Sequence, residues 1–174
     1  MWAGLLLNAA AGVSSRHSIF IDVLSQIGPK EARFLDDIFQ YGANYPLIDN
    51  PPADLRSALF EASKRSIDWA NVKSKAAAEL MVEYFLNFNF GWPVMVEFAE
   101  VYWSPDTSGS KTERVRRRAR SEDAFVVDAL SRQRLIEYFD LDFSPGWASP
   151  RITGYFITPL GVEFVQSCRR AEKP

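Results

Sequence analysis

The sequence is poor in the residues that form disulfides and bind metals. Its 174 residues include one cysteine, Cys168, and one histidine, His17. A lone cysteine has no partner for an internal disulfide, and a histidine-based zinc site needs several histidines. These absences favour a reducing compartment, so we predict a cytoplasmic protein with no metal and no cofactor. Cys168 lies on an apolar stripe and is interpreted as a small core residue.

A long hydrophobic run is also absent. The apolar opening MWAGLLLNAAAGVSS is interrupted by Asn8 and lacks a preceding basic segment. It is far shorter than the ~20 residues that span a bilayer. We therefore predict a buried helix at residues 2–11, with neither a signal peptide nor contact with a membrane.

Catalytic motifs are lacking as well. The chain has no glycine-rich phosphate loop, no nucleophile elbow and no metal-ligand spacing. Glu79 and Glu83, like Glu97 and Glu100, are spaced to share one face of a helix. Paired carboxylates support acid–base chemistry when one is buried, but on polar helices they are usually surface charges. No catalytic residue is therefore predicted, and a toxin-like enzyme using Glu79 or Glu83 is kept as the second alternative.

Apolar and aromatic residues, in contrast, are abundant. Hydrophobic residues make up 47% of the chain, with 5 Trp, 6 Tyr and 13 Phe, which predicts a packed interior. Their three- and four-residue spacing predicts four further helices, at residues 19–27, 29–41, 53–67 and 68–88. The apolar residues of 94–103 fit both a helix and a strand, and a helix is favoured.

The C-terminal third has the element order of a winged-helix unit. A helix from 122 is followed by extended segments at 136–143 and 152–159 and by a final helix at 160–170. In the corner Thr158-Pro159-Leu160-Gly161, threonine is expected to cap the last helix, proline to occupy its first turn, and Gly161 to allow close backbone packing. The corner is interpreted as structural. The predicted fold is mainly α: one helical domain over 1–174 with a small winged-helix-like β-hairpin near the C-terminus.

A basic block at 111–120, KTERVRRRAR, holds one lysine, five arginines and one glutamate. One interpretation is an arm that binds phosphates, because arginine offers a forked donor set. The other is a solvated segment that extends the helix capped by Ser121, with its arginines paired to acids of the same chain. Asp140 and Asp142 make the hairpin acidic and count against DNA binding. The candidate nucleic-acid-binding residues are Lys111, Arg114, Arg116, Arg117, Arg118, Arg120, Arg132 and Arg134.

Aromatic residues also mark a candidate protein interface. In the predicted helix 68–88, Trp69, Val72, Ala76, Leu80, Tyr84 and Phe88 share one side. Clusters of exposed aromatic residues are typical of interfaces. The candidate interface residues are Trp69, Tyr84, Phe85, Phe88, Trp92 and Trp103, and the expected partner is another protein or a second copy of the chain.

Both ends of the chain resemble the bacterial abortive-infection alpha (Abi-alpha) family. At the start, the matching residues are Trp2, Ala3, His17, Ser18, Phe20 and the step from Leu24 to Ala32. At the end, they are Thr158, Pro159, Leu160, Gly161, Phe164 and Cys168. The resemblance covers 1–41 and 125–170, and leaves 42–120 as a helical insertion that carries the basic block.

The resemblance implies a role in bacterial defence against phage and supplies no catalytic residues. Taken with the residues themselves, it predicts a non-enzymatic interaction module of abortive-infection defence that acts through protein–protein contacts. The first alternative is a winged-helix-like regulator that binds nucleic acid through Arg114 to Arg120.

Overall fold

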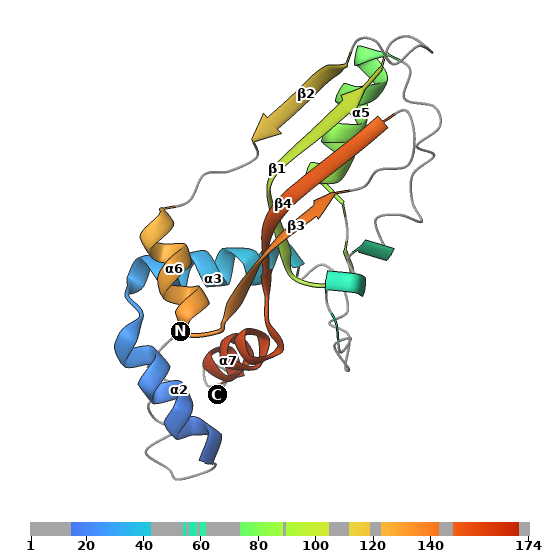
Figure 1. Cartoon of the computed structure of the whole chain (residues 1–174). Coiled ribbons are helices and arrows are strands. Elements are labelled where there is room, and N and C mark those ends of the chain that lie inside the picture. The colour runs from blue at the N-terminus through green and yellow to red at the C-terminus, as the bar shows by residue number, and fades with distance from the viewer. Residues whose placement is uncertain are drawn as a thin grey trace.

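The computed structural model describes residues 15–42, 54, 56–58, 60–61, 74–88, 90–104, 112–118, 123–142 and 148–170. The helix predicted at 2–11 lies outside these residues. The elements are α2 (Ser15–Gln26), α3 (Pro29–Gly42), α5 (Lys75–Leu86), β1 (Val94–Trp103), β2 (Glu113–Arg118), α6 (Ala124–Arg132), β3 (Ile136–Asp142), β4 (Ala148–Ile157) and α7 (Pro159–Arg170) (Figure 1).

The strands form one antiparallel sheet in the order β2-β1-β4-β3. The fold is therefore mixed α/β, and the prediction of a mainly α domain is wrong. The error arises at 94–103, which is β1 and not a helix. Because apolar residues occupy nearly every position there, the spacing did not distinguish the two, whereas pairing on both sides of β1 favours the strand.

The predicted hairpin exists, but it is not a wing. β3 and β4 pair with each other, and β4 also pairs with β1 along its length, from Val94↔Phe156 to Trp103↔Ala148. A wing projects from its domain, whereas this hairpin is an integral part of the sheet. The winged-helix interpretation is therefore wrong, although the strand and helix positions within 136–170 are close to those predicted.

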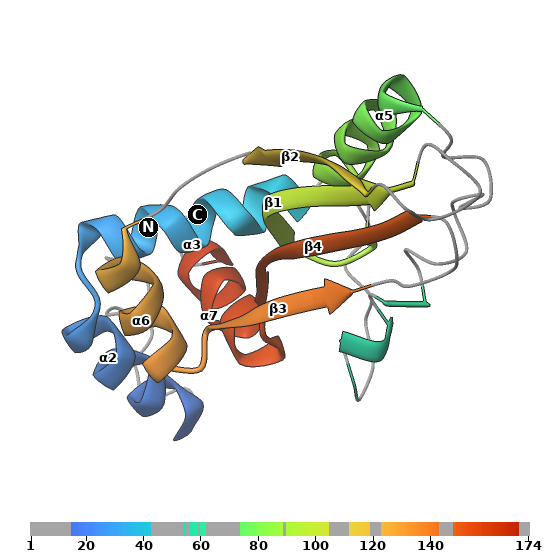
Figure 2. The ribbon, with the colours of Figure 1, turned by 45° about the horizontal axis from the view of Figure 1, so that its top comes forward.

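The helices lie in two groups around the sheet (Figures 1 and 2). α5 packs against β1 and β2, and α2, α6 and α7 gather at the far end of the strands. α3 packs against α6, α7, β1 and β4. One hydrophobic cluster includes residues from every described helix and strand, so the helices and the sheet share a core.

One apolar side of α5 is buried and the other is exposed. Ala78, Met81, Val82 and Phe85 face the sheet, whereas Leu80 and Tyr84 are exposed. Both sides of this helix are apolar, so its periodicity did not reveal which one packs against the sheet.

The corner at Thr158 is the predicted joint between a strand and a helix: it connects β4 to α7. The Thr158 hydroxyl accepts a hydrogen bond from the Gly161 amide at 3.0 Å and donates one to the Arg134 carbonyl at 2.6 Å. Its backbone amide donates to the Leu135 carbonyl at 3.0 Å. α7 begins at Pro159, and a side chain on Gly161 would overlap the Leu135 carbonyl. These contacts fix the start of α7 against the start of β3.

Candidate functional site

The basic block forms the edge strand β2. Glu113 to Arg118 pair with β1, and Val115 lies opposite Val101. The expectation of a helical extension is therefore wrong for these residues, and α6 is capped by Asp123, not by Ser121. Lys111 and Arg120 lie outside the described residues. β2 is at the end of the strand order, so the arginines are presented along one margin of the sheet.

Alternation along the strand separates the arginines between the two faces of the sheet. Arg114, Arg116 and Arg118 share one face, and Val115 and Arg117 share the other. The register places Tyr102, Glu100 and Phe98 opposite the first three. We call the following set the arginine face: Phe98, Glu100 and Tyr102 of β1, Arg114, Arg116 and Arg118 of β2, and Arg151 of β4.

Glu100 is the centre of the arginine face. It is only 3% exposed. Its Oε2 lies 4.0 Å from Nη1 of Arg114 and 3.9 Å from Nε of Arg116, and its Oε1 lies 3.9 Å from Nη1 of Arg151. Burial of a carboxylate is costly unless cations compensate it, and three guanidinium groups surround this one.

Arg151 has a closer partner than Glu100. Its Nε and Nη2 donate to the two carboxylate oxygens of Asp140 at 2.8 and 2.5 Å. This paired hydrogen bond lowers the pKa of Asp140 and raises that of Arg151. Arg151 therefore lies between Asp140 and Oε1 of Glu100, while Arg114 and Arg116 share Oε2 of Glu100.

Aromatic rings position these two arginines. The guanidinium carbon of Arg116 lies 4.3 Å from the centre of the Phe98 ring, and that of Arg114 lies 5.9 Å from the Tyr102 ring. Both are within the range of cation–π attraction. Hydrogen bonding to Tyr102 also raises the pKa of Arg114. The two guanidinium groups are thus held over β1 while their side chains stay half exposed.

The other arginines of β2 have acids of their own. Arg118 Nη2 donates to Glu97 Oε1 at 2.8 Å, and on the opposite face Arg117 pairs with Glu83 of α5. Glu97 sits at a β-bulge and accepts a hydrogen bond from the Tyr155 hydroxyl at 3.4 Å. Burial, and secondarily the charge of Glu97, raise the pKa of Tyr155 to about 12. These pairs leave fewer arginines available for phosphates than the sequence suggests.

Arg132 and Arg134 do not join the arginine face. They belong to α6 and to the turn after it, and α6 stands apart from β2 (Figure 1). Arg132 pairs with Asp128 on its own helix. The candidate nucleic-acid-binding residues are therefore divided between two separate places.

The candidate interface residues are divided in a similar way. Phe85, Trp92 and Trp103 are core residues, so they are not accessible to a partner. Trp92 donates its indole hydrogen to the Ile157 carbonyl at 2.6 Å. Trp69 lies outside the described residues.

Exposed apolar residues remain on the outer side of α5. Leu80 is 72% exposed and Tyr84 is 40% exposed. Phe88 is half-buried, with its ring 5.2 Å from that of Tyr84. We call Leu80, Tyr84 and Phe88 the α5 strip. Leu80 was not among the predicted interface residues, although its position on the same side as Tyr84 had been recognised.

Glu79 and Glu83, the two glutamates of the enzymatic alternative, are surface residues. Glu79 lies 3.9 Å from Lys75, and Glu83 pairs with Arg117; both side chains are more than one-third exposed. Among the described residues, no group of three or more His, Cys, Asp and Glu side chains is arranged to hold a metal ion. The structure therefore offers no buried carboxylate at these positions for acid–base chemistry.

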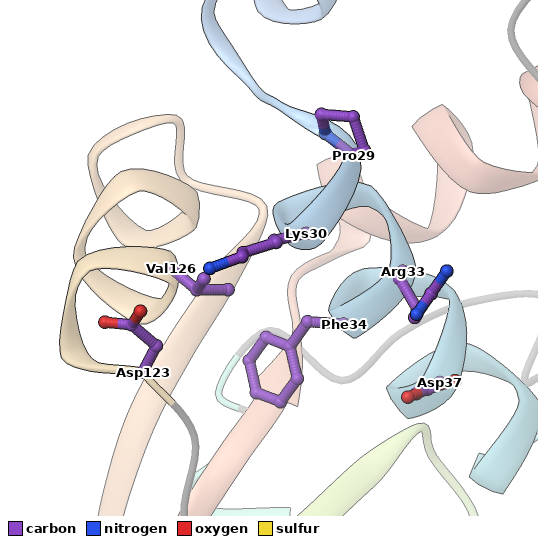
Figure 3. A pocket seen from close by; sticks show the side chains of 7 residues that line it. All are labelled: Pro29, Lys30, Arg33, Phe34, Asp37, Asp123 and Val126. Carbon is purple, nitrogen blue, oxygen red and sulfur yellow. The ribbon is translucent and has the colours of Figure 1, made fainter.

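A pocket lies between the start of α3 and the start of α6 (Figure 3). Its volume is about 250 Å³, and its lining residues are Pro29, Lys30, Arg33, Phe34, Asp37, Asp123 and Val126. Lys30 extends toward Asp123 and Val126, and the Phe34 ring lies beneath it. The two cations are offset by two acids, and Asp123 already caps α6. The pocket thus has no single charge that selects a ligand.

The fold is a four-stranded antiparallel sheet with helices packed against it, which defines a mixed α/β protein. None of the described helices has the length and apolar character required to cross a membrane.

The model of the family abortive infection alpha matches residues 1–90, and the chain belongs to this family. The match includes α2, α3 and α5 and ends just before β1. It extends through residues 42–90, which the sequence resemblance left out, and does not reach the Thr158 to Cys168 segment. No curated protein and no solved structure matches the chain. Family membership associates the protein with abortive-infection defence.

Proposed function

We propose that the protein is a non-enzymatic interaction module of abortive-infection defence that acts through contacts with another protein. The observation that carries this proposal is the exposed α5 strip. Burying a large apolar side chain contributes about 1.5–3 kcal/mol, so exposing Leu80 and Tyr84 on one helix face favours a partner that covers them.

The strip lies next to charged groups suited to the rim of an interface. Glu83, one helical turn after Leu80, pairs with Arg117 of β2. The α5 strip is therefore adjacent to the arginine-bearing edge of the sheet, and an apolar centre with a charged rim is typical of protein interfaces.

A nucleic-acid-binding regulator is less well supported. Four acids, Glu97, Glu100, Asp140 and Asp142, lie on or beside the arginine face and repel phosphates. The winged-helix argument for DNA binding by α6 also fails, because the hairpin that follows α6 is not a wing.

The test is a plaque assay in bacteria that express the full chain, with a phage that the wild-type chain restricts. We expect Leu80→Glu with Tyr84→Glu to reduce protection at least tenfold, because the charges prevent burial of the strip. The matched control is Ile19→Glu with Phe125→Glu, which adds the same charges at exposed apolar positions of α2 and α6. Circular dichroism checks that both variants are folded.

Equal loss of protection in the two double variants, or full protection by the α5 variant, would contradict the proposal. Glu79→Gln tests the enzymatic alternative and leaves Glu83, which belongs to the charged rim, unchanged. We expect this variant to keep its protection; complete loss in a folded protein would support a toxin-like enzyme instead.

A further inference from the structure

We propose that the outer edge of β2 binds an extended acidic segment of a partner protein, which adds to the sheet as a fifth strand. This inference rests on the proposed function and names the chemical class of its partner. The argument uses the open edge, the charge of the arginine face and the position of the α5 strip.

Within the described part of the chain, β2 pairs only with β1, so no other described strand occupies its outer edge. Alternate residues of an edge strand direct their N–H and C=O groups away from the sheet, where they serve as a template for another strand. The opposite edge is different, because the Tyr138 carbonyl of β3 accepts a hydrogen bond from Arg56 at 3.0 Å.

The arginine face provides cations that are incompletely neutralised. Arg114 and Arg116 share Glu100, and their distances of 4.0 and 3.9 Å exceed hydrogen-bonding range. Their side chains are 53% and 50% exposed. A carboxylate on the neighbouring position of an added strand is within reach of these groups, and charge-assisted hydrogen bonds to arginine are strong.

A second copy of β2 is a poor occupant of this edge. Suppose that two copies of β2 pair in antiparallel fashion with Val115 opposite Val115. Arg114 of each copy then lies opposite Arg116 of the other. If the pairing is shifted so that Arg116 is at its centre, Arg116 of one copy lies opposite Arg116 of the other. Like charges placed directly opposite each other destabilise a sheet, so self-pairing is disfavoured and an acidic strand is favoured.

A nucleic acid fits the edge less well than a peptide. A phosphate backbone has no groups that complete the hydrogen bonds of a strand. A phosphate backbone that crosses the arginine face would come near Glu100 of β1 and near Asp140 and Asp142 of β3. A strand added at the edge lies beside the arginines of β2 and remains separated from β3 by two strands.

The opposite face of the added strand meets a different surface. Val115 and Arg117 lie on the face that α5 covers, and Arg117 contacts Glu83, one turn from Leu80. An added strand therefore directs alternate side chains toward the arginine face and toward the side of α5. The expected pattern is acidic residues alternating with apolar ones.

The first experiment selects ten-residue peptides from a randomised display library on the immobilised full chain. We expect enrichment of Asp or Glu at every second position, with apolar residues between them. Selected peptides should bind Arg114→Glu with Arg116→Glu at least tenfold more weakly. The matched control, Arg56→Glu with Arg132→Glu, makes the same change in net charge at two other exposed arginines, and should change the affinity less than twofold.

The second experiment tests strand addition with N-methylated versions of a selected peptide. Only every second backbone amide of an added peptide donates to β2. Methylating these amides should abolish binding, whereas methylating the remaining amides should change the affinity little. Equal tolerance of both sets, or enrichment without alternating acids, would overturn the proposal.

Two further outcomes separate this inference from its alternatives. Tighter binding of a DNA or RNA oligonucleotide than of any selected peptide, lost on reversal of Arg114 and Arg116, would show that the edge serves a nucleic acid. If no acidic peptide is selected while the α5 variant still loses phage protection, the edge proposal fails and the interaction module stands.

Discussion

At the residue scale, Arg134 has an unusual backbone conformation. Its φ angle of 57° is the only positive one among the described non-glycine residues. Its amide donates to the Ser131 carbonyl and that of Leu135 donates to the Leu130 carbonyl, both at 3.0 Å. This is the Schellman arrangement, in which glycine usually occupies the left-handed position. Arg134 was predicted as a nucleic-acid contact, yet its backbone ends α6 and leads into β3.

Arg134→Gly should therefore stabilise the protein. The left-handed conformation costs a residue with a side chain about 1–2 kcal/mol, and the greater entropy of unfolded glycine offsets part of this. We expect a gain of roughly 0.5–1 kcal/mol in the free energy of unfolding, measured by urea denaturation. Arg132→Gly, in the last helical turn, should instead destabilise it by about 1 kcal/mol. A loss of stability in both variants would disprove this explanation.

Gly161 is required for a close approach of two backbones. A Cβ there would overlap the Leu135 carbonyl and the Ile157 side chain. We expect Gly161→Ala to lower the free energy of unfolding by about 2 kcal/mol or more, because the contacts around Thr158 must separate.

Gly28→Ala is the control for that substitution. Its Cβ would meet only the end of the Glu31 side chain, which accepts a hydrogen bond from the Gly28 amide at 2.9 Å. The end of a long side chain shifts more easily than backbone, so we expect a loss below about 1 kcal/mol. Similar losses for the two substitutions, compared by thermal and urea denaturation, would contradict the role assigned to Gly161.

At the element scale, the ion pair between Asp140 and Arg151 links β3 to β4. The hydrogen bond from Arg151 lowers the pKa of Asp140 below its ordinary value of 3.8. A carboxyl group with a lowered pKa stabilises the fold when the pH is above the ordinary pKa of the group. This stabilisation is lost as the pH falls through the lowered pKa. We expect Asp140→Asn to reduce the loss of stability on acidification below about pH 4, followed by denaturation at successive pH values. An unchanged acid profile would show that the pair contributes nothing measurable.

Tyr155 connects β4 to the β1 bulge and governs stability at high pH. Burial first, and then Glu97, raise the pKa of its hydroxyl to about 12. A tyrosine with a raised pKa contributes stability when the pH is below its ordinary pKa of 10.0. This contribution disappears as the pH rises toward 12. Tyr155→Phe should therefore flatten the decline of stability across that interval. A titration of tyrosinate absorbance in which no tyrosine ionises late would refute this assignment.

At the scale of the whole molecule, the family match ends at residue 90 but the hydrophobic core does not. Val82 and Phe85 of α5 are completely buried, and α5 packs mainly on β1, which begins after the matched region. α3 likewise packs on β1, β4, α6 and α7. The helices of the family region thus depend on a sheet outside it.

Residues 1–90 expressed alone should consequently fail to fold cooperatively. Exposing the inner sides of α3 and α5 to water removes the burial that stabilises them, and short isolated helices are marginal. Thermal unfolding followed by circular dichroism should show no sigmoidal transition for this fragment and a single one for the full chain. A cooperative transition in the fragment would establish an independent domain.

Several elements could be predicted because their signals are local. The two strands of the hairpin, the helix α7 and the cap at Thr158 follow from residue spacing, from proline in the first helical turn and from a glycine that permits close approach. The same reasoning recognised the arginine block as the main charged feature and Tyr84 as a surface candidate. Family resemblance at the start of the chain supplied the association with phage defence.

Local residue patterns are enough to locate the apolar segments and the two strands of the hairpin, although β4 begins at Ala148, earlier than the predicted 152. What residues 94–103 and 113–118 form depends on tertiary pairing. Apolar residues at 94–103 suit both periods, and Val115 is the single apolar residue of β2, so neither strand is specified locally. Pairing of β1 with β4, and the acids Glu83, Glu97 and Glu100 beside the arginines, stabilise these strands. Tertiary packing also sets which side of α5 is buried. Phe85 and Tyr84 are both aromatic and adjacent in sequence, and only packing against the sheet buries Phe85 and leaves Tyr84 exposed.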